Sequence, residues 1–339
     1  MAKDHQSIVI AGAGSIGCHA GACLALAGRD VTLLARPRVA DAINAGGLRV
    51  SDIDGFDRLL GDGAIPLAVD PSVLSHADVV LVAVKSGDTA AMAELVARHA
   101  PESAVVVSLQ NGIDNVDRLR AVLGRRRVVA GMVPFNVVQS AEGEMPFHVH
   151  RASAGTVLIE AGDEGLRKLL DVAGFAVVTH ADMPAVQWGK LLMNLNNALV
   201  ALSGLPLAAQ LADARWRRIL ATQIDEALAA MKAKGIAPAK VAAVPPALLP
   251  TVLRLPDWLF LRLARRMLAI DPMARSSMWE DLERRRKTEI GALQGVVLGL
   301  ARKAGTPAPL TERIVALIHD AETRGKGSPR LPPEQVAAN

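Results

Sequence analysis

The sequence predicts an α/β fold, with a doubly wound parallel sheet in the N-terminal part and an all-α domain after it. Three observations lead to this prediction. Short apolar runs alternate with helical patterns over the first 135 residues, which is typical of βαβ units. Strand patterns end near residue 182, and helical patterns dominate from there. The 339 residues, 51% of them hydrophobic, are enough for two cores.

The expected strands of the first domain are short and apolar, and helical patterns separate them. The strands are Ser7–Ala11, Val31–Ala35, Val79–Val84, Ala104–Leu109 and Val128–Val133, and the helices are Ile16–Ala27, Thr89–His99 and Val116–Leu123. Further strands are expected over Phe147–Glu160, where a hairpin could turn through Ser153-Ala154-Gly155, followed by a helix Glu164–Val172 and a strand Phe175–Thr179. Strands that are apolar throughout are buried on both faces, so helices should cover both sides of the sheet.

The second domain is expected to contain helices alone. These are Ala185–Leu202, Asp213–Lys234, Ala247–Leu268, Ser277–Glu283 and Glu289–Ala304. We therefore divide the chain into a dinucleotide-type α/β domain at 1–181, a helical domain at 182–325 and a tail at 326–339. The tail is rich in Gly, Pro and Ser after Gly325, which predicts a frayed, flexible end.

Composition excludes several classes of protein. No run of 18 apolar residues lacks charges, so a membrane span is not expected, and the N-terminus does not read as a signal peptide. The two cysteines, Cys18 and Cys23, fall in one apolar helix, which fits free thiols in a reducing cytoplasm. No metal site is expected. The net charge of +4 could suggest nucleic acid, but the chain has no Tyr and five Phe for stacking, so an anionic cofactor explains the charge better.

The strongest local motif is a glycine-rich turn between the first strand and the first helix. It consists of Gly12, Ala13, Gly14, Ser15, Ile16 and Gly17. In this context G-x-G-x-x-G is the fingerprint of a Rossmann-type domain, in which the helix N-terminus binds a pyrophosphate. The alternative is an ordinary glycine turn between a strand and a helix. The position of the motif at the start of a βαβ chain favours dinucleotide binding.

The residue after the second strand indicates which dinucleotide is bound. Enzymes that use NAD usually carry Asp or Glu there to bind the ribose 2′-hydroxyl. Here the strand ends in Arg36, while Asp30 lies at its other end. An arginine matches a 2′-phosphate through charge-assisted hydrogen bonds, so the sequence predicts NADP (NADPH) as cofactor. The alternative for Arg36 is a solvated surface side chain.

Two further polar positions follow strands, at the edge of the sheet where ligands bind in such folds. Lys85 ends the third apolar strand, and Asn111-Gly112 ends the fourth. Both are candidates for the cofactor site. Asn-Gly also favours turns in general, and a lysine can cap a strand by reaching to solvent. The sequence leaves these alternatives open.

A lysine and two amides mark one face of the first helix after the boundary. Lys190, Asn194 and Asn197 are spaced i, i+4 and i+7, and leucines surround them. Polar groups in such a setting need partners, which a polar ligand in a cleft would supply. A partly desolvated lysine has a lowered pKa, which suits proton donation to a ketone oxygen. A solvated helix face is the alternative.

Two positions further along the chain complete the candidate site. Glu289 heads an apolar stripe on the last expected helix, where a carboxylate needs a cation such as Lys190 or a ligand hydroxyl. It could also complement a helix dipole behind a Thr288 cap. Ser277 and Glu280 have the spacing of a capping box, which is sufficient locally.

Taken together, these motifs resemble the ketopantoate reductase (2-dehydropantoate 2-reductase) family over most of the chain. They keep one order: Gly12–Gly17, Arg36, Val84-Lys85, Gln110-Asn111-Gly112, Trp188-x-Lys190-Leu191-x-x-Asn194, Ser276-Ser277-Met278-x-x-Asp281 and Thr288-Glu289-Ile290. The resemblance implies that NADPH reduces 2-dehydropantoate to pantoate, on the pathway to pantothenate. It also implies a helical domain that closes over the nicotinamide.

The resemblance also implies roles for single residues. Lys190 would be the general acid, and Glu289 would support the lysine and the substrate hydroxyl. Asn194, Ser277 and Asn111 would contact the substrate, Asn111 also lying by the nicotinamide. Lys85 would lie on the side of both cofactor and substrate.

The chain departs from the family pattern at two positions. The family usually has a second asparagine eight residues after the lysine, where this chain has Ala198. Asn197 is one residue early and could substitute for it. A further substrate asparagine has no clear match in Ser203–Ala208. These gaps leave open another 2-oxoacid reductase, related to the β-hydroxyacid dehydrogenases, or a non-catalytic NADP-binding sensor. Apolar C-terminal helices make a homodimer plausible.

Overall fold

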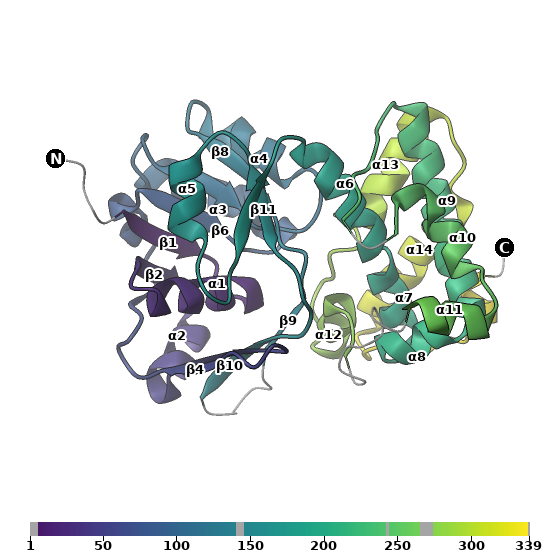
Figure 1. Cartoon of the computed structure of the whole chain (residues 1–339), viewed down its shortest axis with the longest axis horizontal. Coiled ribbons are helices and arrows are strands. Elements are labelled where there is room, and N and C mark those ends of the chain that lie inside the picture. The colour runs from purple at the N-terminus through teal and green to yellow at the C-terminus, as the bar shows by residue number, and fades with distance from the viewer. Residues whose placement is uncertain (1–5, 140–145, 242–243, 265–273, 338–339) are drawn as a thin grey trace. The chain divides into compact units, whose positions relative to one another are not determined.

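The computed structural model describes residues 6–139, 146–241, 244–264 and 274–337. The chain forms two compact units, Met1–Met183 and Pro184–Asn339. In Figure 1 the first unit runs from purple to teal and the second from teal to yellow. Each unit is described by itself below.

The first unit is built on an eight-stranded sheet of order β12-β11-β8-β7-β6-β1-β2-β5 within the described residues. Its strands are β1 (Ser7–Ala11), β2 (Asp30–Leu34), β5 (Leu67–Ala68), β6 (Val79–Val82), β7 (Val105–Ser108), β8 (Val128–Met132), β11 (Val157–Glu160) and β12 (Val177–His180). The run from β5 to β8 is parallel, and β11 is antiparallel to β8. The predicted α/β fold with a parallel sheet is confirmed, and an antiparallel pair is added at one end.

The helices of this unit cover both faces of the sheet. They are α1 (Ser15–Leu26), α2 (Pro37–Gly46), α3 (Thr89–His99), α4 (Asn115–Leu123) and α5 (Glu164–Leu170), of which α2 was not expected. In the strand order, the crossover from β1 to β2 runs in the opposite direction to the one from β6 to β7. Because parallel crossovers are right-handed, α1 and α3 lie on opposite faces. All four residues of β6 are buried, as its apolar run predicts.

A second, four-stranded sheet packs on α1, and the sequence did not predict it. Its order is β4-β3-β10-β9, with β3 (Leu48–Asp52), β4 (Asp57–Leu60), β9 (Val137–Gln139) and β10 (Phe147–Arg151). The hairpin considered through Ser153-Ala154-Gly155 is wrong. β10 pairs with β3 and β9, whereas β11 pairs with β8 and β12, so the two strands belong to different sheets. Alternating apolar residues show that a segment is a strand but do not identify its partner.

The second unit is helical in the residues that the structure describes. Its elements are α6 (Met183–Asn194), α7 (Asn196–Ser203), α8 (Leu207–Ala212), α9 (Ala214–Ala233), η3 (Pro246–Leu248), α10 (Leu249–Leu253), α11 (Asp257–Ala264), α12 (Ser277–Glu283), α13 (Gln294–Ala304), α14 (Pro309–Arg324) and α15 (Pro333–Ala337). The expected helix 185–202 is divided at Leu195. The expected helix 247–268 is three short pieces, and its residues 265–268 lie outside the described part. α14 was not anticipated.

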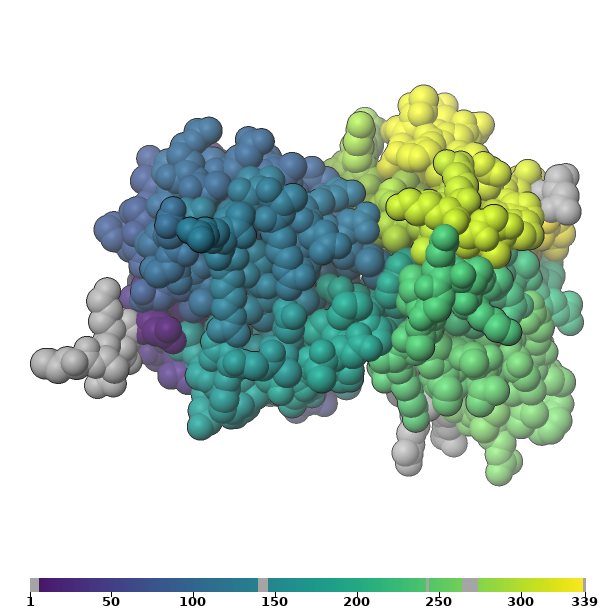
Figure 2. Space-filling model, turned by 90° about the horizontal axis from the view of Figure 1, so that it is seen from above, coloured from purple at the N-terminus to yellow at the C-terminus, as the bar shows by residue number. Residues whose placement is uncertain are grey.

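The C-terminal segment is packed, which corrects the prediction of a flexible tail. The Leu331 amide donates to the Leu202 carbonyl oxygen at 2.8 Å, and the Ser328 hydroxyl donates to the Ala201 carbonyl oxygen at 2.7 Å. Val336 in α15 is completely buried. In Figure 2 the yellow C-terminal residues form a continuous part of the surface of this unit. The Gly, Pro and Ser content pointed to fraying, but these contacts, and those of Arg313 with the carbonyl oxygens of Gln335 and Val336, hold the segment in place.

Two expectations from composition can be compared with the structure. No helix in the described residues is long and apolar enough to cross a membrane. Cys18 and Cys23 are both buried free thiols, and burial raises the pKa of each to about 12. Such thiols are unreactive and pack as small apolar side chains.

Candidate active site

The glycine-rich turn after β1 has the geometry of a dinucleotide fingerprint. Gly12 has a φ of 115°, and a Cβ there would lie 2.7 Å from Cγ1 of Val84. A Cβ at Gly17 would overlap the carbonyl oxygen of Gly12. These two glycines therefore permit the tight turn and the close packing of α1 on β1.

Gly14 has no such structural requirement. It is exposed at the N-cap of α1, and no atom of the described chain lies within 4 Å of a Cβ built there. The first turn of α1 contains no acidic residue that would oppose a bound anion. Open space at Gly14, beside the N-terminus of α1, fits the pyrophosphate of a dinucleotide.

Arg36 lies at the N-cap of α2, directly after β2, as the strand pattern predicted. Its side chain is 84% exposed and pairs with Asp88, Nη2 to Oδ2, at 3.0 Å. Asp88 belongs to η2 (Ser86–Asp88), the turn after β6. The sequence has no carboxylate directly after β2, and the fold brings one there from the turn after β6.

A buried network of hydrogen bonds fixes the backbone at Lys85 and Asn111. The Ser86 hydroxyl and the Asn115 amide both donate to the Asn111 carbonyl oxygen, the first at 3.0 Å. The Gln110 amide donates to the Val84 carbonyl oxygen at 3.0 Å and to the Thr89 hydroxyl at 2.8 Å. The ends of β6 and β7 are thus held together. Lys85 is exposed on this support, and Asn111 is partly exposed.

Lys190 lies on α6, is partly buried and has buried neighbours along the helix. Leu191 and Leu192 beside it are buried, as is Asn194 one turn later. Burial lowers the pKa of Lys190 from 10.5 to about 8. The preceding residue, Gly189, has no room for a side chain, because a Cβ there would overlap the carbonyl oxygen of Ala239. The segment around Ala239 thereby packs directly on the helix turn that carries the lysine.

The predicted polar stripe of Lys190, Asn194 and Asn197 runs across the junction of α6 and α7 at Leu195, whose backbone angles remain helical. Lys190 and Asn194 share α6, whereas Asn197 lies in α7 and is partly exposed. Two side chains bind the backbone at this junction. The Gln294 amide donates to the Leu195 carbonyl oxygen at 2.9 Å, and the Ser276 hydroxyl donates to the Asn197 carbonyl oxygen at 2.9 Å.

The predicted capping box at Ser277 is wrong. Ser276 is the N-cap of α12 and accepts a hydrogen bond from the Trp279 amide at 3.2 Å. Ser277 is the first residue of the helix and is exposed. Because Ser276 supplies the cap, the Ser277 hydroxyl is left for another role.

Glu289 does not lie on a helix, which corrects the predicted stripe over 289–304. α13 begins at Gln294, and residues before it form turns. The Thr288 hydroxyl donates to Glu322 at 2.7 Å and accepts from the Ile290 amide at 3.2 Å. Thr288 therefore fixes the turn that carries Glu289 instead of capping α13, and Glu289 is partly exposed.

Comparisons with known proteins agree with this architecture. Residues 8–164 match the family model described as ketopantoate reductase PanE/ApbA, and residues 182–322 match the model of its C-terminal part. The chain belongs to the ketopantoate reductase family. It is therefore an oxidoreductase, and the fold class and family expected from the sequence are confirmed.

Individual relatives cover nearly the whole chain. A 2-dehydropantoate 2-reductase of Halobacterium salinarum is 27% identical over 94% of this chain and 99% of its own length. The crystal structure of a PanE/ApbA family ketopantoate reductase from Ralstonia eutropha JMP134 is 31% identical, covers 95% of this chain and 100% of that one, and has a TM-score of 0.78. A ternary structure of D-mandelate dehydrogenase with NADH and anilino(oxo)acetate has the same fold, at 19% identity, 94% and 99% coverage and a TM-score of 0.76.

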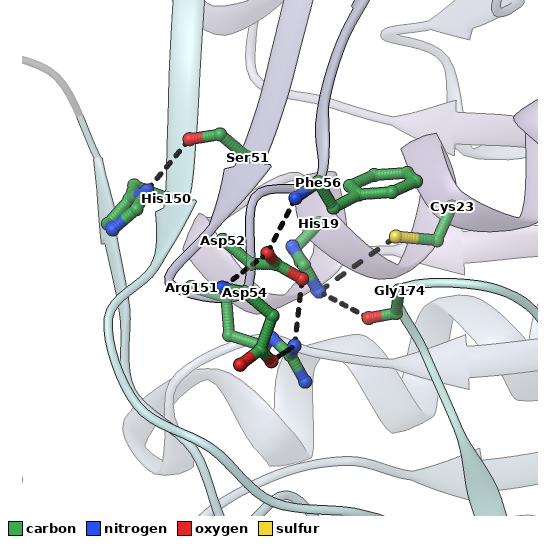
Figure 3. Close-up of polar contacts among 9 residues, drawn as sticks. All are labelled: His19, Cys23, Ser51, Asp52, Asp54, Phe56, His150, Arg151 and Gly174. Carbon is green, nitrogen blue, oxygen red and sulfur yellow. Dashed lines mark hydrogen bonds and ion pairs between the residues drawn. The ribbon is translucent and has the colours of Figure 1, made fainter.

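This ketopantoate reductase family member has a second, largely buried polar cluster, which includes His19 of α1 (Figure 3). The Arg151 guanidinium pairs with Asp52 at 2.8 Å and with Asp54 at 2.7 Å. His19 on α1 contacts the Gly174 carbonyl oxygen at 3.0 Å, and desolvation lowers the pKa of its imidazole to about 4. These contacts join the four-stranded sheet, α1 and the segment before β12, so they stabilise the domain from which the glycine turn projects.

Sequence reasoning missed the residues that position the site. Thr89, Gln110 and Asn115 support Lys85 and Asn111, and Asp88 pairs with Arg36. The signal for Gln110 was a polar residue directly after an apolar strand, whereas Thr89 and Asn115 begin the helices that follow β6 and β7. For Asp88 there was no local signal, because its partner lies 52 residues away.

Proposed function

We propose that this protein reduces 2-dehydropantoate (ketopantoate) to pantoate with NADPH, on the route to pantothenate. The observation that carries the proposal is Lys190, a lysine on an apolar helix whose pKa burial lowers to about 8. It occurs in a chain of the ketopantoate reductase family that also has a dinucleotide-type glycine turn. Relatives that cover nearly the whole chain are named 2-dehydropantoate 2-reductase.

The residues present fit a dinucleotide. The N–H groups at Ala13, Gly14, Ser15 and Ile16 would bind the pyrophosphate, and Arg36 would bind the 2′-phosphate through its guanidinium. Lys85 and Asn111, on their buried support, would lie toward the nicotinamide end. When bound, the cofactor supplies the hydride for the ketone carbon.

Lys190 would supply the proton. Hydride addition leaves negative charge on the ketone oxygen, and the Lys190 ammonium would stabilise that charge and donate to the oxygen. With its pKa lowered to about 8, the ammonium is still protonated at neutral pH and releases its proton more readily than an exposed lysine.

The remaining predicted site residues would orient the substrate. Glu289 would accept a hydrogen bond from the substrate hydroxyl and steady the lysine. Asn194, Ser277 and Asn111 would donate to the carboxylate and ketone oxygens. Asn197 would replace the amide that the family has one position later, where this chain has the fully buried Ala198.

Ala198 also favours a second candidate substrate. With a methyl group at the position of a family asparagine, the pocket has fewer donors for the hydroxymethyl and carboxylate groups of ketopantoate. An NADPH-dependent reductase of another branched 2-oxoacid is therefore the alternative. A non-catalytic NADP-binding sensor is the weaker candidate, since it gives no reason for a lysine with a lowered pKa on this helix.

A matched pair of substrates tests the proposal. NADPH oxidation is measured with ketopantoate and with 2-oxoisovalerate, which lacks only the hydroxymethyl group. Recognition of that hydroxyl predicts a kcat/KM for ketopantoate at least about tenfold higher. Equal values, or a preference for 2-oxoisovalerate, would favour the alternative 2-oxoacid reductase. Binding of NADPH without turnover of any 2-oxoacid would favour the sensor.

A further inference from the structure

The carboxylate of Asp88 lies near the end of β2, the place that distinguishes NAD from NADP in Rossmann-type domains. In Rossmann-type domains the adenosine ribose binds at the end of β2, where an acid accepts the 2′-hydroxyl of NAD or an arginine binds the 2′-phosphate of NADP. This chain has both groups at that place. Arg36 follows β2, and Asp88 is 3.0 Å from its guanidinium.

The orientation of Asp88 shows that its side chain is directed to Arg36. Asp88 is at the N-cap position of α3, where aspartate normally accepts a hydrogen bond from the first turn of the helix. Within the described residues it makes no such cap bond. Its carboxylate instead pairs with Arg36, and its side chain is 51% exposed. A group that forgoes a local cap bond is available to a ligand at the end of β2.

The turn that carries Asp88 is held firmly. The Asp88 amide donates to the Lys85 carbonyl oxygen at 2.8 Å, and the Thr89 hydroxyl donates to the Ser86 carbonyl oxygen at 3.0 Å. Ser86 and Thr89 are both buried. The carboxylate is therefore presented from a rigid turn, while the long Arg36 side chain can rotate.

We propose that Asp88 sets the cofactor preference of this chain. Its carboxylate weakens the binding of the 2′-phosphate of NADPH and strengthens the binding of the 2′-hydroxyl of NADH, so that the protein uses both cofactors. The inference rests on the proposed function, because it assumes that a nicotinamide dinucleotide binds at the glycine turn. It adds a second determinant to Arg36.

The charges account for both halves of this effect. A bound 2′-phosphate is attracted by Arg36, but it competes with Asp88 for the guanidinium and is repelled by the carboxylate. A 2′-hydroxyl meets no repulsion and can donate to Asp88, while Arg36 keeps its partner. Removal of the Asp88 charge should thus strengthen the binding of NADPH and weaken that of NADH.

The test is the ratio of two dissociation constants on the full chain. NADPH and NADH are titrated by fluorescence, and ADP-ribose 2′-phosphate and ADP-ribose are titrated by calorimetry, so that the nicotinamide is not needed for the readout. The variants are Asp88→Asn and Asp88→Ser, both of which preserve a good N-cap residue for α3. Asp320→Asn is the matched control, because Asp320 is half exposed and pairs with Arg324 at 2.8 Å in the helical unit.

We expect both Asp88 variants to bind the 2′-phosphorylated nucleotides roughly three- to tenfold more tightly and the 2′-hydroxyl nucleotides severalfold more weakly. Arg36→Ala should weaken the binding of NADPH and of ADP-ribose 2′-phosphate. Asp320→Asn should leave the ratio of the NADPH and NADH dissociation constants unchanged. High salt should reduce the effect of the Asp88 substitutions.

An unchanged ratio in both Asp88 variants would overturn the inference while leaving the proposed function intact. A wild-type chain that binds none of the four nucleotides would overturn both. Wild-type binding of NADPH with no measurable binding of NADH would also contradict the inference, because it assigns Asp88 a role in accepting NADH.

Discussion

The side-chain amide of Gln294, at the first residue of α13, donates a hydrogen bond of 2.9 Å to the carbonyl oxygen of Leu195. Leu195 separates α6, which carries Lys190 and Asn194, from α7, which carries Asn197. A buried side chain from a distant part of the chain thus holds the junction between the two parts of the proposed substrate site, together with Ser276. Gln294 is fully buried, so this bond is not exchanged for water.

Replacement of Gln294 by leucine should therefore impair the site as well as the fold. It leaves the Leu195 carbonyl without this donor in the core, which typically costs about 1–3 kcal/mol. We expect a lower free energy of unfolding and a higher KM for the 2-oxoacid, with the Kd of NADPH unchanged. Denaturant unfolding and steady-state kinetics measure both.

A second buried glutamine provides the control. Gln223 on α9 is also fully buried, but neither of its side-chain polar atoms has a hydrogen-bond partner within the described residues. Gln223→Leu should be neutral or stabilising, with unaltered KM. If Gln294→Leu and Gln223→Leu behaved alike, the Gln294 bond would have no special role.

The glycine turn allows fold and ligand binding to be separated. A Cβ at Gly17 would overlap the Gly12 carbonyl oxygen, whereas a Cβ at Gly14 meets no atom of the described chain within 4 Å. Gly17→Ala should lower the melting temperature by several degrees. Gly14→Ala should leave the melting temperature unchanged but weaken NADPH binding by about tenfold or more, because the methyl group occupies the space in front of the helix N-terminus. Equal effects of the two substitutions on stability would show that Gly14 is structural.

His19 should make the protein sensitive to acid. Desolvation lowers the pKa of the folded-state imidazole from 6.5 to about 4, opposed by its hydrogen bond to Gly174. A depressed pKa means that the stability contribution is complete above about pH 6.5 and is lost as the pH falls toward 4. His19→Gln should flatten the decline in melting temperature over this range, whereas His76→Gln, at an exposed position, should not. Parallel curves for wild type and His19→Gln would refute this role.

Asn197 tests whether the missing family amide has been replaced. If its side chain binds the substrate, Asn197→Ala should raise the KM for the 2-oxoacid by roughly tenfold or more and leave NADPH affinity intact. Asn196→Ala is a useful comparison, because the Asn196 amide is buried in a reciprocal pair with Gln210 at 3.1 Å and should affect stability instead. An unchanged KM in Asn197→Ala would indicate that the pocket is built from other residues.

The sequence predicted the sheet and the glycine turn well, because both depend on local patterns. Apolar runs and glycines mark β1, α1 and β6 without knowledge of the rest of the chain. The four-stranded sheet was missed because β3 and β10 pair over a separation of about a hundred residues, and the alternation of apolar residues in each strand does not identify its partner. The tail was misjudged because its anchors, Leu331 and Val336, are single residues in a polar stretch.

The candidate site, like the fold, was predicted correctly where the signal is local and incorrectly where it depends on distant residues. Arg36, Lys85 and Asn111 follow strands, so strand order alone placed them at one edge of the sheet. The helical periodicity predicted a helix that begins at Glu289, but this residue lies in a turn, fixed by Thr288 and Glu322, that precedes α13. The periodicity also predicted one helix across Leu195, where Gln294 and Ser276 bind the backbone at the junction of α6 and α7. Contacts such as Arg36 with Asp88 depend on the tertiary fold and leave no local pattern.

Lys190 provides the most direct test of the account. A positioned general acid contributes about 10²–10⁴-fold in rate, so Lys190→Ala should lower kcat by that factor while NADPH still binds. Because the protonated ammonium is required and burial lowers its pKa to about 8, the wild-type rate of ketone reduction should fall as the pH rises through 8. The measurement is kcat for ketone reduction from pH 6 to 10 in wild type and Lys190→Ala, with NADPH affinity measured in parallel. The account predicts a decline near pH 8 in wild type and a slow, flat profile in the variant. A Lys190→Ala enzyme with near-normal kcat and the same decline near pH 8 would contradict it.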